Sequence, residues 1–242
     1  MIYLSVYTSL LVSVIIQVIT GIIETISLFI KVPLHFLFLK QMMALEIFVQ
    51  FIEGLFYIYW LYDFKNISNI TPKRYFDWMI TTPTMLINLI FYLIFLEYKD
   101  NHASDKLNFF ESDKLNFFAS DKLNFFDLWN KEFYTIITVL LLNWCMLLFG
   151  YLAEITVIPV TLGVSLGFIP FLIYYYIIYS KYALLSKDGI KIYLYFFIFW
   201  SFYGIVALLP YKMKNICYNI LDLFSKNFFG LFLFYLIFTN KY

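Results

Sequence analysis

The chain has 242 residues, of which 63% are hydrophobic, 24% are aromatic and only 14% are charged. One soluble core of this length could not bury so much apolar surface, so the composition excludes a soluble domain and indicates an integral membrane protein. A net charge of +1 provides no attraction for nucleic acid, and no nucleic-acid partner is expected. Cys145 and Cys217 both fall in apolar runs where thiols usually only pack, so neither a disulfide framework nor a metal site is expected.

Several stretches are long and apolar enough to cross a membrane as helices, which takes about 20 residues each. The first one continues past Gly21 without a short hydrophobic region and a cleavage site, so we interpret it as a retained span. The sequence therefore predicts an all-α membrane protein in which residues 1–242 form a single seven-helix bundle. The seven predicted spans are residues 3–29, 33–61, 75–97, 133–152, 155–180, 189–209 and 215–238.

The distribution of lysine predicts the orientation of this bundle in the lipid bilayer. Seven spans place the two termini on opposite sides of the membrane. One set of loops, together with the C-terminus, is rich in lysine, whereas the opposite loops hold only Lys65, Lys73, Lys212 and Lys214. Because cytoplasmic loops carry the excess of positive charge, we expect the N-terminus outside and the C-terminus in the cytoplasm.

A repeat of eight residues occupies much of the loop predicted over residues 99–131. Its three copies cover residues 103–110, 111–118 and 119–126, and each reads Ser-Asp-Lys-Leu-Asn-Phe-Phe after an alanine or a glutamate. Eight residues advance a helix by about 80° beyond two turns, so the apolar positions would form no single stripe. We interpret the repeats as a tandem duplication in a cytoplasmic loop, where phenylalanine can dip into the interface and lysine can meet anionic headgroups.

Polar residues recur at steps of three and four along four of the spans, which places them on one face of each helix. A lone polar residue in a membrane helix more often makes an interhelical hydrogen bond than lines a pore. Four stripes together can line one wet path, and the fourth to sixth spans are poor in such residues. The stripes are Ser13, Gln17, Thr20, Glu24 and Ser27 in the first span, Glu46, Gln50, Glu53 and Tyr57 in the second, Arg74, Asp77, Thr81, Thr84 and Asn88 in the third, and Asn215, Asn219, Asp222 and Lys226 in the seventh.

Charged residues at membrane depth need partners and a function, because each costs about 2.5–3.5 kcal/mol even on lenient insertion scales. Asp222 lies four residues before Lys226, on the same helix face. Glu46 and Glu53 have no basic residue in their own span and need water, cations or protons to be tolerable. Files of carboxylates line cation pathways in channels.

The third and seventh spans carry a set of residues that resembles the microbial (type I) rhodopsins. The resemblance implies that Lys226 holds all-trans retinal as a Schiff base, that Asp77 and Asp222 are its two counterions, and that Arg74 stabilises this charge pair. An ion cluster that packs helices in an unrelated transporter is the alternative. The resemblance also implies a retinal pocket and, as is usual in the family, a homo-oligomer. The remaining pocket residues that it implies are Trp78, Thr82, Met85, Asn143, Met146, Gly150, Trp200, Tyr203 and Ser225.

The polar residues favour one activity within this family. A chloride pump usually lacks the carboxylate that Asp77 retains. Asn88 stands where the best-known outward proton pumps carry a carboxylic donor, and an asparagine cannot release a proton at neutral pH. Glu46 and Glu53 are spaced as in channelrhodopsins, and the first and seventh spans resemble the viral members in particular. We therefore predict a light-gated channel for monovalent cations or protons, not an enzyme, with a path lined by Ser13, Gln17, Glu24, Glu46, Glu53, Thr81, Asn88, Asn215 and Asn219.

The predicted gate is a set of hydrogen bonds involving Glu53, Ser13 and Asn219. They are expected to break after retinal isomerises and the Schiff-base proton moves to Asp77 or Asp222. One alternative is a weak outward proton pump in which Glu46 or Glu24 acts as the donor. Another is a photosensor, which would need a separate transducer.

Overall fold

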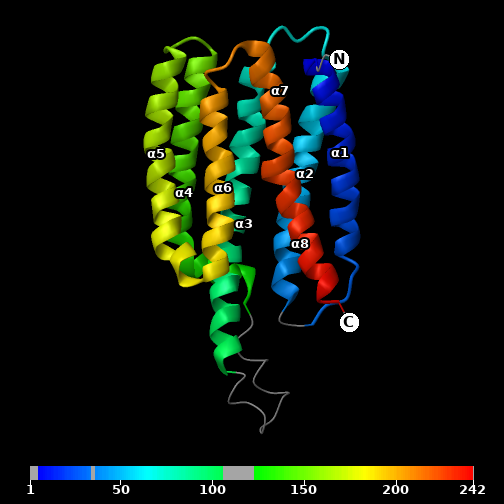
Figure 1. Cartoon of the computed structure of the whole chain (residues 1–242), viewed down its shortest axis with the longest axis vertical. Helices are drawn as coiled ribbons and strands as arrows, with labels where there is room; N and C mark the ends of the chain where they lie inside the picture. Colours follow the sequence, from blue (N-terminus) through cyan, green and yellow to red (C-terminus); the bar gives the residue numbers. More distant parts are fainter. Residues whose placement is uncertain (1–4, 34–35, 106–122, 242) are drawn as a thin grey trace.

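The computed structural model describes residues 5–33, 36–105 and 123–241, and these form a bundle of long helices (Figure 1). Seven of the described helical segments are long and apolar enough to cross a membrane, which confirms the predicted seven-helix architecture. The described chain begins near one end of the bundle and finishes near the other. The elements are α1 (Val6–Ser27), α2 (Leu37–Tyr62), α3 (Thr71–Asp105), α4 (Phe125–Glu154), α5 (Val160–Lys181), the short 3₁₀ turn η4 (Ala183–Leu185), α6 (Lys187–Val206), α7 (Tyr211–Asp222), the π-helical turn η5 (Leu223–Asn227) and α8 (Phe228–Thr239).

Two predicted spans are too short, and the loop between them is correspondingly too long. Helix α3 continues to Asp105 and α4 already begins at Phe125, so both enter the predicted loop of residues 99–131. The Asn124 side chain accepts a hydrogen bond from the Phe126 N–H at 3.2 Å, which caps the start of α4. The second octad repeat and at least half of each of the others lie outside the described residues, so the interpretation of the repeats stays a prediction.

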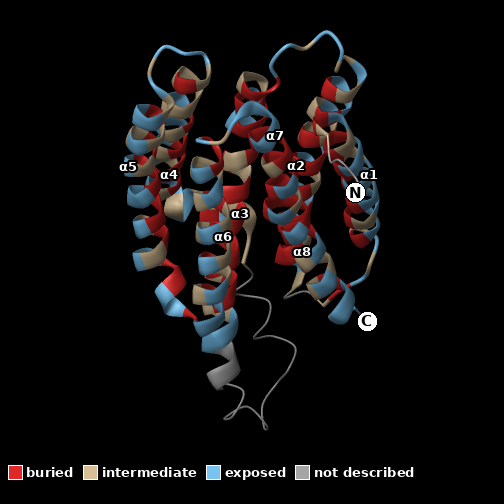
Figure 2. Ribbon diagram, turned by 45° about the horizontal axis from the view of Figure 1, so that its top comes forward, coloured by how far each residue is buried: buried red, intermediate tan, exposed pale blue. Residues whose placement is uncertain are grey.

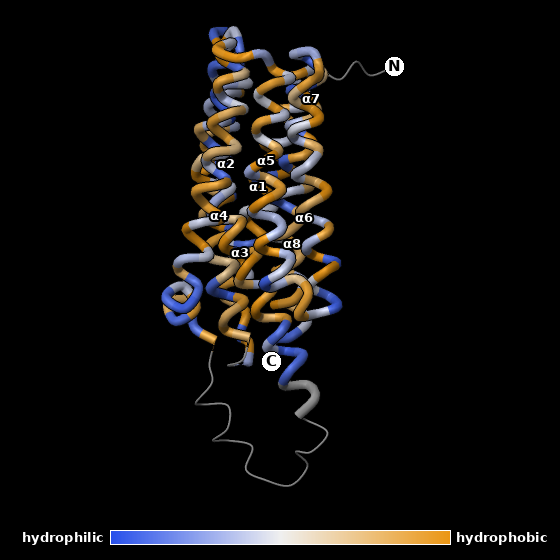
Figure 3. Tube along the Cα trace, turned by 90° about the vertical axis from the view of Figure 1, so that its left-hand side faces the viewer, coloured by the Kyte–Doolittle hydropathy of each residue, from blue (hydrophilic) through white to orange (hydrophobic). Residues whose placement is uncertain are grey.

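The side chains are arranged as expected for a bundle whose surroundings are apolar. Buried residues lie on the inward sides of the helices and exposed residues on the outward sides (Figure 2), and most of the helical trace is hydrophobic (Figure 3). Many large hydrophobic side chains are exposed, as suits apolar surroundings. In α1 the apolar residues face outward and the polar residues face inward. Ile15, Ile19 and Ile22 are more than half exposed, whereas the polar stripe is buried. Helix α3 is central: 72% of its most apolar stretch is buried, against 28–50% in the other spans.

The two sides of the bundle have different interiors. The side built from α4, α5 and α6 is filled with aromatic rings, such as Phe171 against Tyr175 with ring centroids 4.7 Å apart. Helices α4 and α5 also approach closely, since a Cβ atom on Gly163 would lie only 2.9 Å from the Phe149 carbonyl oxygen. The other side, built from α1, α2, α3, α7 and α8, has the polar interior that the stripes predicted.

Candidate functional site

Lys226 lies at the centre of the bundle in η5, where the seventh span widens from α-helical to π-helical hydrogen bonding. Its amine Nζ lies 3.0 Å from Asp77 Oδ2, 3.7 Å from Asp222 Oδ1 and 3.3 Å from Glu53 Oε1. The three carboxylates are buried, and oxygens from all three lie within 4.8 Å of one another. Glu53, predicted to line an ion path, is therefore a third carboxylate at the lysine.

Arg74 supplies the second buried cation of this cluster. Its Nη1 lies 3.4 Å from Asp222 Oδ2 and donates to Tyr57 Oη at 2.9 Å. The Tyr57 hydroxyl in turn donates to Asp222. Among the ion pairs of the described residues, Arg74 is joined to Asp222 and not to Asp77. Buried charges are tolerable only when paired and hydrogen-bonded, so Tyr57 completes the cluster, a role that its place in the α2 stripe did not reveal.

Two asparagines predicted to line the ion path hold the Arg74 guanidinium. Arg74 Nη2 donates to Asn219 Oδ1, and Nε donates to Asn215 Oδ1 at 3.2 Å. The Asn219 amide also donates to Ser9 Oγ at 2.8 Å, and the Ser13 hydroxyl donates to the Asn219 backbone carbonyl at 3.4 Å. The polar groups in this upper half, meaning the half of the bundle toward the N-terminus in Figure 1, are thus largely hydrogen-bonded to one another.

The predicted gate is only partly brought together. Ser13 and Asn219 touch, but no hydrogen bond in the described part of the chain joins Glu53 to either of them. Periodicity identified the face of α2 on which Glu53 lies but not its partner, which is Lys226. Thr81, also predicted for the path, is buried and donates to the Asp77 carbonyl at 3.0 Å.

The lower half, from Lys226 toward the C-terminus, is less connected. Asn88 donates to Glu46 Oε1 at 2.8 Å and to the Met42 carbonyl at 3.1 Å, so a carboxyl on α2 meets the asparagine on α3. Gln17, Glu24 and Asn227 are at most 2% exposed. In the described residues, both polar side-chain atoms of Gln17 and of Asn227, and Oε2 of Glu24, have no hydrogen-bond partner.

Asn227 was missed by the search for helical stripes. It lies five residues after Asp222, and five is the hydrogen-bond step of a π-helix, whereas the stripes were sought at steps of three and four. The signal available in the sequence was an amide directly after the lysine in an otherwise apolar run.

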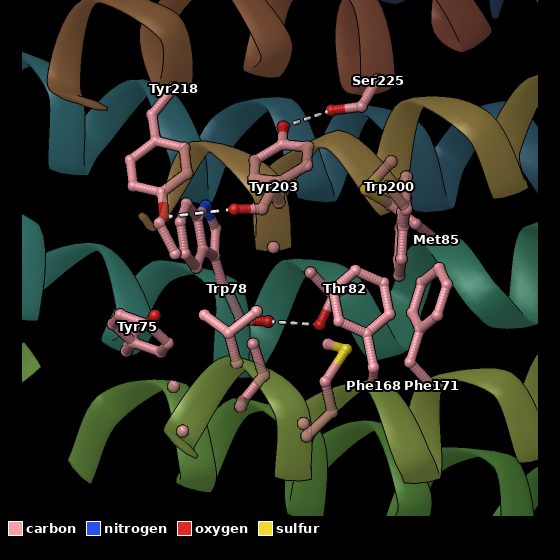
Figure 4. A pocket seen from close by; sticks show the side chains of 18 of the residues that line it. Tyr75, Trp78, Thr82, Met85, Phe168, Phe171, Trp200, Tyr203, Tyr218 and Ser225 are labelled. Carbon is pink, nitrogen blue, oxygen red and sulfur yellow. Dashed lines mark hydrogen bonds between the residues drawn. The ribbon is translucent and has the colours of Figure 1, made fainter. Parts of the chain in front are cut away.

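An aromatic pocket extends from Lys226 between α3, α4, α5 and α6 (Figure 4). Its polar end is formed by Tyr203, which donates to Asp222 Oδ1 at 2.7 Å and lies 2.7 Å from Ser225 Oγ. Glycine makes room for rings along it, since a Cβ on Gly204 would lie 2.6 Å from Phe168. The lining residues are Tyr75, Trp78, Thr82, Met85, Met146, Leu147, Gly150, Gly163, Val164, Gly167, Phe168, Phe171, Trp200, Tyr203, Gly204, Ala207, Tyr218, Ser225 and Lys226.

This pocket fits a flat, apolar, conjugated molecule that ends in an aldehyde. Flat rings surround its interior, and the amine that could form the covalent link lies at one end with carboxylates beside it. Every residue predicted to contact retinal lines the pocket except Asn143, which lies behind it. The Asn143 amide donates to Thr82 Oγ1 at 2.8 Å, so it joins α4 to α3.

A second buried lysine lies away from the pocket. Lys214 was assigned to a loop from the sequence, but it belongs to α7 and is 7% exposed. Its Nζ lies 2.6 Å from Glu154 Oε1 at the end of α4. The ion pair explains how a lysine is tolerated there, and it ties the upper ends of α4 and α7 together.

Comparison with known proteins agrees with this architecture. The viral rhodopsin OLPVRII is 26% identical, with a TM-score of 0.74 over 97% of this chain and 98% of that one. Xanthorhodopsin, described as a light-driven ion pump with dual chromophore, is 15% identical, with a TM-score of 0.68 over 98% and 93% of the two chains. The proton-pumping rhodopsin AR2 from Acetabularia acetabulum is 16% identical, with a TM-score of 0.68 over 97% and 96%. At these identities the two pumps establish the fold alone.

No match was found among curated proteins. The family model described as bacteriorhodopsin-like protein matches residues 5–240. The chain therefore belongs to the bacteriorhodopsin-like family, the microbial rhodopsins.

Proposed function

We propose that this rhodopsin is a light-gated cation channel with retinal attached to Lys226. The proposal rests on the residues that α1 buries. Six of the eight buried residues of this helix are polar, and they run along nearly its whole length: Ser9, Ser13, Gln17, Thr20, Glu24 and Ser27. Any helix in lipid turns its apolar residues outward, but a helix that only packed against its neighbours would bury small or hydrogen-bonded residues. This one buries Gln17, whose side chain has no hydrogen-bond partner in the described residues, and Glu24, whose Oε2 has none. The arrangement supports a hydrated path along α1.

The residues around Lys226 are suited to respond when the cofactor changes shape. When bound, retinal supplies the absorption of light and a change of geometry at its link to Lys226. Asp222 already accepts from Tyr57 and Tyr203 and faces Arg74. Asp77 Oδ2 lies 3.0 Å from the lysine nitrogen, and its other oxygen has no hydrogen-bond partner in the described chain. Asp77 is therefore the proposed acceptor of a proton from that nitrogen.

Transfer of that proton would unbalance the buried charges and open the path. A neutral Asp77 and a neutral nitrogen leave Asp222 with Arg74 as its cation and leave Glu53 without one. At this burial, an uncompensated carboxylate attracts water or another cation. Arg74, which now spans the upper half through Asn219, is the group that must move for a cation to pass. Its network with the α7 asparagines is the proposed upper gate.

Whole-cell photocurrents test this proposal directly. Cells that express the chain with added retinal are illuminated while the voltage is stepped under altered sodium, potassium and proton gradients. A channel predicts current that reverses near a cation equilibrium potential. Glu53→Gln should alter conductance or selectivity while the pigment still forms, whereas Glu132→Gln, the same change at a residue that bonds Tyr182 on the aromatic side, should leave the current unchanged. Outward current that persists at zero driving force contradicts a passive channel.

A weak outward proton pump is the second candidate, and one contact favours it. The hydrogen bond between Asn88 and Glu46 puts a carboxyl where the third span lacks one. In a pump, Glu46 would return a proton toward Lys226 from the lower half. Glu46→Gln would then abolish steady outward current and slow recovery of the pigment, whereas in a channel it would leave the reversal potential governed by cations.

A further inference from the structure

The side chain of Glu24 on α1 occupies a notch in α8. A Cβ atom added to Gly230 would overlap Glu24 Oε1 and lie 2.6 Å from its Cδ and 3.3 Å from its Cγ. The neighbours of Gly230 in the chain, Phe229 and Leu231, are large. Small residues in membrane helices commonly let two backbones approach. Here the absence of a side chain admits a carboxyl group.

Little holds the carboxyl in this notch apart from its fit. Glu24 is 1% exposed, its Oε2 has no hydrogen-bond partner among the described residues, and no described lysine or arginine forms an ion pair with it. A lone carboxylate at this depth is costly unless it holds a proton or meets water or a cation. The side chain can therefore leave the notch without breaking a strong contact.

The notch lies at the lower end of the polar stripe of α1. Asn227, with its unpaired amide, lies about one turn before Gly230 in the seventh span, and Gln17 lies two turns above Glu24 on the same face of α1. After Glu24, the stripe continues only to Ser27, whose hydroxyl bonds the Glu24 backbone carbonyl at 2.5 Å. Glu24 is the one carboxyl residue of α1, and it lies in the last turn before the helix ends.

We propose that the Glu24 carboxyl, seated against Gly230 between α1 and α8, is the lower gate of the cation path. Seated, it fills the space between the two helices and closes the path. Released, it turns into the path and offers a carboxylate oxygen to a departing cation. The proposal rests on the channel function proposed above. It assigns closure of the lower half to one side chain and one glycine.

Filling the notch tests the gate. Gly230→Ala should slow the decay of current after the light is switched off by about tenfold, which corresponds to a barrier to closing that is about 1.4 kcal/mol higher. Gly54→Ala is the matched control, because a Cβ added to that glycine of α2 meets no atom within 4 Å. The control should close at the wild-type rate. Glu24→Asp, which draws the carboxyl back by one methylene, should slow closure in the same direction even where Gly230→Ala fails to fold.

A double variant separates the gate from a general effect on packing. Glu24→Ala removes the carboxyl that closes the path, so it should slow closure by itself. Gly230→Ala should then add nothing, because the effects of substitutions at two contacting residues are not additive. Glu24→Gln keeps the shape, so it should close normally but pass less cation current. Slowing by Gly230→Ala that persists at full size in the Glu24→Ala background would overturn the gate.

The outcomes distinguish this proposal from the channel function on which it rests. Wild-type current without a cation-dependent reversal potential would sink the channel and its gate together. Passive wild-type current with normal closure in both Gly230→Ala and Glu24→Asp would overturn the gate alone. Light-minus-dark infrared spectra of the purified pigment give a readout that does not depend on current. These spectra should contain a carboxyl band that is lost in Glu24→Gln and shifted in Gly230→Ala. If Glu24→Gln removes no carboxyl band from the difference spectrum, the gate is also overturned.

Discussion

Two buried asparagines of the seventh span, one above Lys226 and one below it, lie in opposite surroundings. Asn219 bonds Arg74 and Ser9, whereas neither amide atom of Asn227 has a partner in the described residues. The carboxyls differ in the same way, since Asp222 is held by two tyrosine hydroxyls and a guanidinium and Glu24 by its fit alone. The upper half is largely a bonded network, whereas several buried polar groups of the lower half have no hydrogen-bond partner in the described residues.

This difference determines how each half can change. A satisfied buried network is rigid, because loss of one member leaves the others desolvated and unpaired. Unpaired groups already bear that desolvation cost, so they gain when water or a cation reaches them. The upper half therefore needs a change in charge to open, which the groups around Lys226 can provide. The lower half needs only a small movement of side chains.

The largest effect is expected where the two halves meet. Lys226→Ala should abolish the visible absorption band after retinal is added, because the attachment amine is gone. Lys214→Ala is the matched control: it also removes a buried lysine from an ion pair, but at a site outside the pocket. Absorption spectra of both purified variants check this. A normal visible band in Lys226→Ala, or its loss in folded Lys214→Ala, would show that the attachment site is wrong.

Arg74→Gln should produce the next largest effect, by removing the cation of the upper half. Loss of one partner from a buried ion pair typically costs about 3–5 kcal/mol, since the remaining charge is left uncompensated. We expect a drop of this order in the free energy of unfolding, measured by denaturant titration of the pigment. A loss below about 1 kcal/mol would mean that water, and not the network, supports Asp222.

Tyr57→Phe tests the same network with a single oxygen. The Tyr57 hydroxyl donates to Asp222 and accepts from Arg74, so its removal should cost about 1–3 kcal/mol. Tyr175→Phe is the control, because the hydroxyl of this equally buried tyrosine has no hydrogen-bond partner in the described residues. It should be neutral or stabilising. Both variants are measured by the same titration. If they lose the same free energy of unfolding, the hydrogen bonds of the Tyr57 hydroxyl do not stabilise the protein.

The sequence predicted the faces of the helices better than the contacts between them. Apolar length gave all seven spans, and steps of three and four residues identified the polar faces of α1 and α2. Periodicity gives a direction around a helix axis but no height relative to a partner. The placement of Glu53 against Lys226 therefore could not be read from it, because that contact depends on how α2 and the seventh span align.

Other differences have local causes. Asn227 was missed because the π-helical turn shifts the register of the seventh span after Asp222. Lys214 was assigned to a loop because its partner, Glu154, is 60 residues distant in the chain. Nine of the nineteen residues that line the pocket were predicted, and these came from the family resemblance and not from periodicity. The resemblance named no lining residue of α5, which contributes Gly163, Gly167 and Phe171 among others.

The smallest effect on the free energy of unfolding is expected in the lower half. Whether this effect is a loss or a gain distinguishes the two halves most clearly. Gln17 and Gln50 face each other from α1 and α2, but only the Gln50 side chain is bonded, donating to the Gln17 backbone carbonyl at 3.1 Å. Gln50→Leu should therefore cost about 1 kcal/mol, whereas Gln17→Leu should be neutral or slightly stabilising, since an unpaired buried amide is replaced by an apolar side chain. If Gln17 lines the path, the same Gln17→Leu variant should nevertheless carry less photocurrent than the wild type. If Gln17→Leu raises the free energy of unfolding and lowers the photocurrent, the lower half keeps its unpaired groups for conduction. If Gln17→Leu loses as much stability as Gln50→Leu, the Gln17 side chain is hydrogen-bonded.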